Sequence, residues 1–334
     1  MRSLPGFQFT DRPALFDHLV SLETKVDVPE LSLDGRATLL LREPTTARKA
    51  LSSAFVRKGR SPASARGVGG YVSLGGDRFI PARTDVLAAL RRSASDQEGL
   101  ISSQAYPDTC LALVAHLAGT LPDEAFAELL SAVVHELTVR PHVETDQRRD
   151  LVDQLTATLS STSPFVRELT TRGWPGEAIA SEIVALSFAG WSSLAAAIRS
   201  AQTLSVTGPT VSSSAISELL RIAPPAWLIV RECTDSLDLG ATRVSVGTLL
   251  LTSPWLLHRD HRGWSQPTEF GPARRGTRTN PWYLPFSLGK RSCPAELYSR
   301  AFLQATLSRL PDQPAADDAR PSLLGSRSAC LLPA

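Results

Sequence analysis

The chain has 334 residues, a formal net charge of +2 at pH 7 and a hydrophobic content of 43%, as expected for a globular protein with one large or two small domains. A charge this close to neutral argues against a nucleic-acid-binding protein, which would carry a strong basic excess. The four cysteines are widely scattered, so neither a disulfide framework nor a zinc site is expected.

Membrane insertion and export are not expected from the apolar pattern. The N-terminal residues contain no apolar run of signal-peptide length. The longest apolar stretches elsewhere are judged too short to span a bilayer. We therefore expect a cytoplasmic protein without a membrane anchor.

The first part of the chain, to about residue 79, mixes short alternating runs with turns. Residues 37–41 and 70–74 have the pattern of strands, and residues 46–55 can form a helix between them. From about residue 83 the pattern becomes helical, with apolar residues at helical spacing in three segments, 110–118, 124–139 and 147–159.

The segment 177–199 is apolar on all faces at its centre, which is typical of a helix buried on every side. Glu177 would lie in its first turn. Residues 214–222 form the next predicted helix, which begins after a run of serines suited to capping and ends before Pro224 and Pro225.

The remaining part contains short strands and turns at 228–251, irregular segments to about residue 285, and a last helix from after Pro294 to about Leu310. Residues 311–334 are predicted as loop with a short terminal segment. The sequence thus indicates one mainly α domain, 1–334, with a small β part. Its β-containing parts are 1–80 and 226–285, and its helical parts are 83–222 and 294–310.

Cys293 differs from the other cysteines in its surroundings. Phe286, Gly289 and Arg291 precede it and a predicted helix follows. The N–H groups at the start of that helix would stabilise a thiolate. Gly289 would allow a tight turn and a close approach of the backbone to a planar group, and Arg291 would supply a cation for a carboxylate. The alternative is a buried cysteine in a turn.

The order Phe-x-x-Gly-x-Arg-x-Cys-x-Ala resembles the haem-binding signature of the cytochrome P450 family. The resemblance implies a soluble, bacterial-type haem-thiolate protein in which Cys293 is the axial ligand to the iron of haem b (iron protoporphyrin IX). It also implies that Phe286 packs beside the sulfur and that Arg291 pairs with a haem propionate. The implied fold is that of cytochrome P450, with the haem between the central buried helix and the helix after the cysteine loop.

Glu218 and Arg221 are three residues apart on one predicted helix, where they can pair, although this spacing alone usually gives a solvated ion pair. The resemblance implies a buried network of these two residues with Arg274, which ends the family-like segment Phe-x-Pro-x-Arg at 270–274. It also implies that Arg231, in the strand that follows Pro225, contacts a haem propionate.

Arg83 is similar in position to a propionate-binding arginine of the family's third helix, although Phe79 stands where the family usually has histidine. The resemblance further implies substrate contacts from the central helix and from the strand near residue 228: Phe188, Trp191, Trp227, Leu228 and Ile229.

The central helix departs from the family pattern at the oxygen-activation site. Family members usually carry an acid followed by an alcohol, which relay protons, whereas this chain has Ala189, Gly190, Trp191, Ser192 and Ser193. Gly190 would open a groove beside the oxygen site, and Ser193 can donate a hydrogen bond. Ser192 is neither an acid nor a base near neutral pH. The alternative role of both serines is hydrogen bonding to carbonyls of their own helix.

The segments between Arg83 and Ala189 and between Ser193 and Glu218 are short for the family, so a reduced roof over the substrate pocket is expected. The first functional hypothesis is a monooxygenase that hydroxylates or oxidatively couples a hydrophobic or carrier-bound small molecule in secondary metabolism. No reductase-like segment is present, so electrons would come from a separate ferredoxin and ferredoxin reductase, with Lys290, Arg291 and Arg300 facing the ferredoxin.

Two other hypotheses stay open. One is a haem-thiolate enzyme that uses peroxide, isomerises its substrate or relies on a substrate group for proton delivery. The other is a non-catalytic family member that acts as partner or scaffold. His116, His135 and His142 lack metal-ligand spacing and are assigned core or surface roles.

Overall fold

The computed structural model describes residues 6–8, 11–23, 31–58, 78–103, 108–120, 123–139, 146–312, 318–324 and 328–333. The chain divides into two compact units. The first contains Met1–Ser61, Arg199–Cys293 and Asp312–Ala334, and the second contains Pro62–Ile198 and Pro294–Pro311. The predicted β-containing parts lie mainly in the first unit and most of the predicted helices in the second. The single domain stays a prediction.

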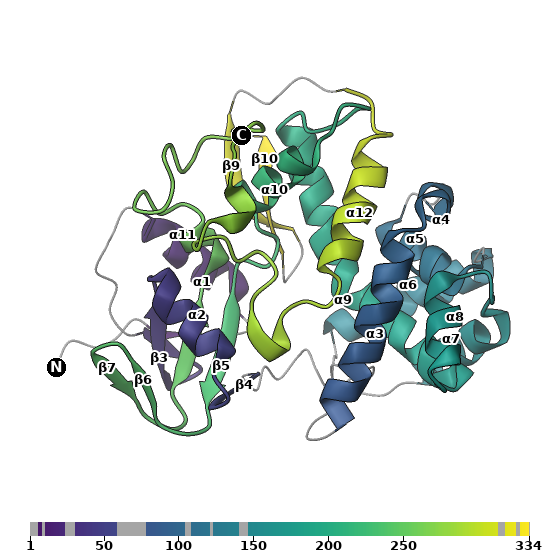
Figure 1. Ribbon diagram of the computed structural model, residues 1–334, viewed down its shortest axis with the longest axis horizontal. Coiled ribbons are helices and arrows are strands. Elements are labelled where there is room, and N and C mark those ends of the chain that lie inside the picture. Colours follow the sequence, from purple (N-terminus) through teal and green to yellow (C-terminus); the bar gives the residue numbers. More distant parts are fainter. Residues whose placement is uncertain are drawn as a thin grey trace. The chain divides into compact units, whose positions relative to one another are not determined.

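The first unit contains a six-stranded sheet in the order β1-β2-β3-β8-β5-β4. Strands β3, β5 and β4 of this sheet are labelled in Figure 1. Its strands are β1 (Gly6–Phe7), β2 (Leu31–Leu33), β3 (Arg36–Leu41), β4 (Val56–Lys58), β5 (Ile229–Cys233) and β8 (Leu249–Thr252). Strand β3 runs parallel to β8, and β5 runs antiparallel to it. The sheet therefore joins the N-terminal part of the chain to the part around residue 250.

The helices of this unit are short, and two 3-10 turns lie among them. They are α1 (Arg12–Ser21), α2 (Pro44–Ser52), α10 (Ser213–Ile222), α11 (Pro254–Leu257), η3 (Thr277–Thr279) and η4 (Gly289–Arg291). The sequence did not predict α1. The helix predicted at 46–55 begins two residues earlier and ends at Ser52, and the predicted strand at 70–74 lies outside the described residues.

Core residues cover both faces of this sheet. Successive residues of β3 and β8 point to opposite faces and enter two different core clusters. On one face, Leu40 belongs to a core cluster with Phe16 of α1 and Trp255 of α11. On the other, Leu41 belongs to a second cluster that includes Leu284. The chain segment that leads to the cysteine loop is therefore anchored in the core.

Two hairpins complete the first unit. One pairs β6 (Leu237–Leu239) with β7 (Thr242–Val244), and the other pairs β9 (Ala319–Leu324) with β10 (Ser328–Pro333). The second hairpin corrects the prediction of a loop at the C-terminus. Leu331 enters the core cluster of α1, and its N–H donates to the Ser200 hydroxyl at 3.0 Å. These long-range contacts stabilise a strand that was not predicted from its four consecutive apolar residues, 329–332.

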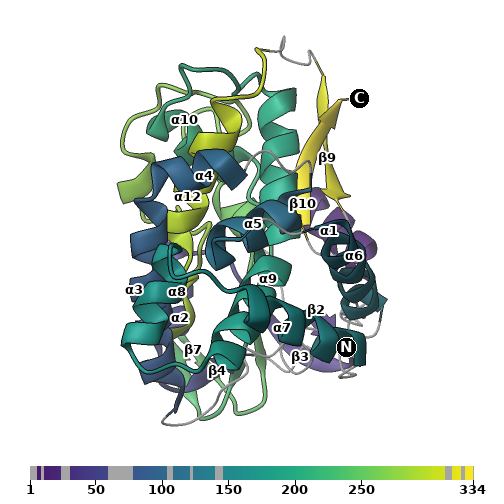
Figure 2. The same cartoon turned by 90° about the vertical axis from the view of Figure 1, so that its right-hand side faces the viewer.

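The second unit is helical (Figure 2). Its helices are α3 (Phe79–Ala94), α4 (Gln97–Ser103), α5 (Thr109–Ala118), α6 (Glu124–Val139), α7 (Asp146–Thr158), α8 (Pro164–Thr171), most of α9 (Gly176–Thr203) and α12 (Glu296–Leu307). Helix α3 packs against α8 and α12. Asp85 of α3 pairs with Arg172 at 2.8 Å and accepts a hydrogen bond from the Trp174 indole at 3.0 Å.

Helix α9 confirms the predicted central helix but is not buried along its whole length. Ile183, Val184 and Ala185 are buried, whereas Ala189 is exposed. By length and composition alone α9 is long and apolar enough to cross a membrane, which corrects the statement that every apolar stretch is too short. Half of its most apolar window is buried inside the protein.

Candidate active site

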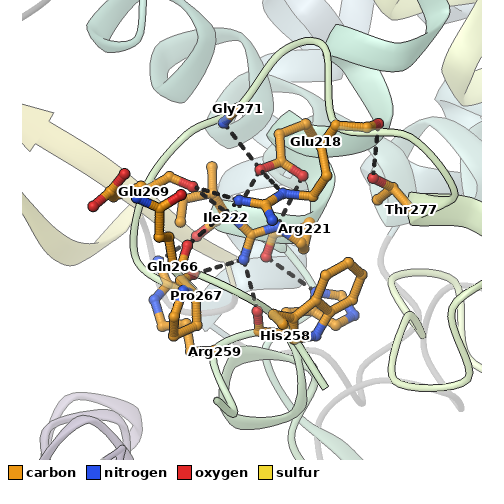
Figure 3. A network of polar contacts seen from close by, with 12 residues as sticks. Glu218, Arg221, Ile222, His258, Arg259, Gln266, Pro267, Glu269, Gly271 and Thr277 are labelled. Carbon is orange, nitrogen blue, oxygen red and sulfur yellow. Dashed lines mark hydrogen bonds and ion pairs between the residues drawn. The ribbon is translucent and has the colours of Figure 1, made fainter. Parts of the chain in front are cut away.

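Glu218 and Arg221 form a buried ion pair in the first unit, and neither side chain has exposed surface (Figure 3). The Arg221 guanidinium donates to both carboxylate oxygens of Glu218 at 2.8 Å. Its remaining N–H groups donate to the carbonyl oxygens of His258, Pro267 and Glu269 at 2.6–2.8 Å. One arginine thus ties α10 to the irregular segment that follows α11.

Arg274 joins this pair from the segment 270–274. Its Nε donates to Glu218 Oε1 at 2.9 Å, and the Gly271 N–H donates to the same oxygen at 3.1 Å. Burial alone would raise the pKa of Glu218, but the hydrogen bonds and charges of Arg221 and Arg274 outweigh burial and lower the pKa. The carboxylate is therefore ionised at neutral pH, and the sequence-predicted trio lies together in the first unit.

Cys293 is exposed, whereas Cys110, Cys233 and Cys330 are buried. This finding excludes the alternative of a buried cysteine in a turn. The Cys293 N–H donates to the Phe286 carbonyl at 2.9 Å, which closes the loop between them. The side chain of Phe286 is half-buried. The thiol is thus presented from a backbone loop whose two ends are hydrogen-bonded together.

Two left-handed residues shape this loop. Ser287 has φ +61° and Gly289 has φ +77°. A Cβ on Gly289 would lie 2.4 Å from the Leu51 carbonyl oxygen at the end of α2. The predicted tight turn is therefore present. The close contact that requires glycine is made with the backbone of α2 in this structure.

Arg231 of β5 and Arg291 of η4 bring two cations close to the cysteine loop. The Arg231 guanidinium donates to the Val230 carbonyl at 2.9 Å and to the Ser287 hydroxyl at 3.3 Å. Burial, followed by repulsion from Arg291, lowers the pKa of Arg231 to about 10. Within the described residues, no carboxylate pairs with Arg231. A dianionic ligand at this position would relieve the repulsion between the two cations.

The chain was compared with known proteins at the levels of sequence and structure. The sequence model of the family named Cytochrome P450 matches residues 210–323. Tabersonine 3-oxygenase from Catharanthus roseus is 33% identical over 104 residues, which are 28% of this chain and 21% of that protein. Cyclooctatin synthase from Streptomyces melanosporofaciens is 37% identical over 99 residues, again 28% and 21%. The chain spans about a fifth of the length of the curated relatives it matches.

The fold agrees over almost the whole chain. A six-coordinated cytochrome P450 from Thermus thermophilus superposes with a TM-score of 0.68 at 22% identity, covering 98% of this chain and 97% of that one. The chain therefore has the cytochrome P450 fold, and residues 210–323 match the sequence model of that family. The predicted fold class is therefore confirmed, and the reduced roof stays a prediction.

The substrate contact predicted for Trp227 is wrong. The indole has no exposed surface and meets the Phe16 ring edge-on, with ring centroids 5.0 Å apart. Ile229 is also buried, in the core cluster on the other face of the sheet, and Leu228 is half-buried. The family resemblance implied that these three residues border the substrate pocket. The packing of α1 against the sheet instead places Trp227 in the core.

The cationic surface predicted for a redox partner also needs a correction. Lys290 is exposed and Arg291 is half-buried. Arg300 of α12 is buried and forms an ion pair with Glu296 at 3.3 Å. Its helix packs against α3 and α4, so the Arg300 guanidinium is not available to an acidic protein.

The predicted oxygen-site residues of α9 differ in exposure. Phe188 is buried, Ala189 is exposed, and the side chains from Trp191 to Ser193 are half-buried. A Cβ on Gly190 would meet a methyl carbon of Leu113 at 3.4 Å, an ordinary contact, so this glycine is not required by packing. The propionate-binding candidate Arg83 is half-buried on α3. All these residues belong to the second unit, and Cys293 belongs to the first.

A second buried network, which the sequence did not predict, links three elements of the second unit. Nδ1 of His116, on α5, lies 2.9 Å from the Tyr298 hydroxyl of α12. Its Nε2 faces Asp96, between α3 and α4, at 3.4 Å. Burial lowers the pKa of His116, although Asp96 raises it in part, and burial also raises the pKa of Tyr298. The network thus anchors α12 through neutral side chains.

Proposed function

We propose that this protein is a cytochrome P450, a haem-thiolate oxidoreductase in which Cys293 binds the iron of haem b. The observation that carries the proposal is the exposed thiol on a closed backbone loop beside two neighbouring cations, Arg231 and Arg291. These residues fit a haem, which offers an iron to a thiolate and two propionates to arginines. Arg83 is proposed as a further propionate contact.

Several groups would hold the thiol in one direction. The bond from the Cys293 N–H to the Phe286 carbonyl fixes the end of the loop, and Gly289 seats the loop against the end of α2. The buried trio of Glu218, Arg221 and Arg274 holds the segment before the loop. When bound, the haem supplies activation of dioxygen with electrons from outside the chain.

The reaction we propose is monooxygenation of a hydrophobic small molecule, by hydroxylation or oxidative coupling. The names of the relatives, an oxygenase and a synthase of specialised compounds, support this class of reaction and a role in secondary metabolism. Phe188 and Trp191 of α9 are the proposed apolar contacts for the substrate. The substrate itself, whether unbound or attached to a carrier, is not specified by these residues.

Proton delivery is proposed to involve Ser193. Its hydroxyl can both donate and accept a hydrogen bond, as a relay requires. Ser192 stands where the family usually has an acid and cannot release a proton near neutral pH. The proton would then come from water or from a polar group of the substrate. Replacing Ser193 with alanine is expected to lower the fraction of electrons that reach product, and unchanged coupling would remove Ser193 from the mechanism.

We further propose that the protein is cytoplasmic and receives electrons from a ferredoxin and its reductase. Lys290, exposed on η4, would attract an acidic ferredoxin and chiefly raise its rate of association. Arg291, half-buried beside Arg231, is better suited to the haem than to the partner.

One observation favours a second candidate function. Ser192 replaces the usual acid. A haem-thiolate enzyme that uses peroxide, isomerises its substrate or takes the proton from a substrate group needs no acid at this position, so Ser192 is compatible with such an enzyme. A monooxygenase should consume NADPH and dioxygen with a ferredoxin system, whereas a peroxide-using enzyme should form product with hydrogen peroxide alone. A third possibility is a non-catalytic scaffold, which the absence of haem from the purified protein would favour.

The test compares two cysteine variants expressed with a haem precursor. Cys293→Ala is expected to lose the ferric thiolate absorption spectrum, while Cys233→Ala, which changes a buried core cysteine, is expected to keep it. A normal thiolate spectrum in Cys293→Ala would refute the assignment of the iron ligand.

A further inference from the structure

His258 is a buried histidine that caps the C-terminal end of α11 and lies beside Arg221 (Figure 3). Its Nδ1 lies 3.1 Å from the Arg221 carbonyl, and its Nε2 accepts a hydrogen bond from the Leu284 N–H at 2.8 Å. Its own carbonyl accepts from the Arg221 guanidinium at 2.8 Å. Arg221 and His258 therefore bind each other through both backbone and side chain.

The partners of the ring fix its protonation. The Leu284 amide can only donate, so Nε2 must be an acceptor, and the Arg221 carbonyl can only accept, so Nδ1 must carry the proton. Burial, followed by the charges of Arg221 and Arg259, lowers the pKa of His258 and so disfavours a second proton. The imidazole is thus neutral and in one tautomer, with both of its polar atoms used.

Aromatic packing holds the ring in this orientation. The imidazole stacks on Tyr283, with centroids 5.3 Å apart and an interplanar angle of 22°, and meets the edge of Trp264 at 6.5 Å. The Tyr283 hydroxyl donates to the Ser217 carbonyl at 3.1 Å, one residue before Glu218. Rotating the imidazole would break both hydrogen bonds and both ring contacts.

From Leu284 the hydrogen bonds continue to the cysteine. The Leu284 carbonyl accepts from the Ser287 N–H at 3.3 Å, and the Ser287 hydroxyl accepts from Arg231. The Phe286 carbonyl, one residue before Ser287, accepts from the Cys293 N–H at 2.9 Å. The two hydrogen bonds of the His258 ring therefore join the Arg221 backbone to the start of this loop.

We propose that His258 is a positioning residue that couples the Glu218–Arg221–Arg274 network to residues 284–293 and so sets the direction of the Cys293 thiol. The coupling between the network and the loop can be tested without haem. Its consequence for iron ligation rests on the proposed function, in which Cys293 is the iron ligand.

Three substitutions separate the two hydrogen bonds of the ring. His258→Gln places an amide oxygen near the position of Nε2 and can keep the acceptor for Leu284. His258→Asn places an amide N–H near the position of Nδ1 and can keep the donor to Arg221. His258→Phe keeps ring stacking and loses both bonds. Tyr283→Phe is the matched control, because it removes one hydrogen bond from the same cluster and leaves the His258 bonds in place.

The first readout is hydrogen–deuterium exchange of peptides covering residues 284–293. We expect exchange at the Leu284 amide to accelerate by about tenfold or more in His258→Phe and His258→Asn, and to stay within about threefold of wild type in His258→Gln and Tyr283→Phe. Equal acceleration in all four variants would overturn the proposal, because it would reflect general loss of stability. If His258→Phe does not fold, the Gln and Asn variants still decide the question, since they differ in which bond they keep.

The second readout is the carbon-monoxide difference spectrum of the reduced protein. His258→Asn is expected to lose a larger share of the thiolate-type band than His258→Gln, which should resemble Tyr283→Phe. Indistinguishable spectra in a wild type that does show the thiolate band would overturn the effect on ligation. A wild type without haem would instead refute the proposed function, and the exchange experiment would still test the coupling.

Discussion

The two buried polar networks of this protein are built on opposite principles. In the first unit, Glu218 and Arg221 are charged, have no exposed surface, and use nearly every donor and acceptor that they carry. In the second unit, His116 and Tyr298 are held neutral by burial, and a partly exposed Asp96 lies at one end. The first network braces irregular backbone, where regular hydrogen bonding is absent, whereas the second joins helices that already satisfy their own backbones.

This difference predicts how each network fails. Removing one partner of a buried ion pair leaves an uncompensated charge, which costs far more than a lost neutral hydrogen bond. Damage in the first unit should also spread to the cysteine loop, because Arg221 and His258 hold the segment from which that loop departs.

Breaking the charged network should have the largest effect. Arg221→Met leaves Glu218 buried with Arg274 as its remaining cation, and we expect the free energy of unfolding to fall by about 3–5 kcal/mol. Urea unfolding followed by circular dichroism measures the loss. The exposed pair of Arg149 and Asp146 supplies the control, since Arg149→Gln should change the free energy by less than about 1 kcal/mol. Similar losses in the two variants would contradict the account.

The next effect concerns the loop that the charged network supports. Gly289→Ala combines a left-handed backbone with a clash against Leu51, whereas Gly35→Ala has a similar φ of +72° and open space around the new methyl group. We expect Gly35→Ala to cost about 1–2 kcal/mol and Gly289→Ala to cost about 1–3 kcal/mol more. Thermal unfolding measures both, and equal costs would show that contact with α2 is unimportant.

The pH dependence of the free energy of unfolding should reveal the lowered pKa of His258. Burial, followed by repulsion from Arg221, lowers its pKa to about 3 in the folded state, while an unfolded histidine has an ordinary value near 6.5. As pH falls below about 6.5, only the unfolded chain takes up this proton, so stability is full above that pH and is lost toward pH 3. At pH 5 the loss should be about 2 kcal/mol relative to pH 7.

The corresponding control is His258→Gln, which cannot titrate. Its free energy of unfolding should decline less than that of wild type between pH 7 and pH 5. The lowered pKa of His116 acts in the same direction in both proteins and cancels in the comparison. Parallel declines in the two proteins would indicate that the pKa of His258 is not lowered in the folded state.

The neutral network should give the smallest effect. Tyr298→Phe removes the hydrogen bond to His116 Nδ1, and we expect a loss of about 1–2 kcal/mol. Adding His116→Leu should recover part of that loss, because both polar partners are then replaced by apolar groups. A larger loss in the double variant would show that the interaction of His116 with Asp96 carries the stability instead.

What the sequence could predict depends on how local the signal was. Glu218 and Arg221 lie on one helical turn, so their pairing could be inferred from spacing, whereas their burial and the contact with Arg274 were implied only by the resemblance of these segments to the family's motifs. The residues of the cysteine loop are also close together in the sequence, since Phe286, Gly289, Arg291 and Cys293 occur within eight positions. These segments also lie in the part of the chain that the family sequence model matches.

The remaining interactions could not be read from spacing. His258 meets Leu284 across 26 positions, and His116 meets Tyr298 across 182. Nothing local marks a histidine as neutral, because its protonation follows from the groups that fold around it. The burial of Trp227 and the C-terminal hairpin likewise depend on packing against α1 and α9, which the local pattern did not predict.

The measurement that tests the central claim most directly is the carbon-monoxide difference spectrum of the dithionite-reduced wild-type protein, together with its haem content. We expect a thiolate-type band and about one haem per chain, since one cysteine-loop ligand serves one iron. A protein that binds no haem after expression with the haem precursor, or binds haem without the thiolate band, would contradict the assignment of Cys293.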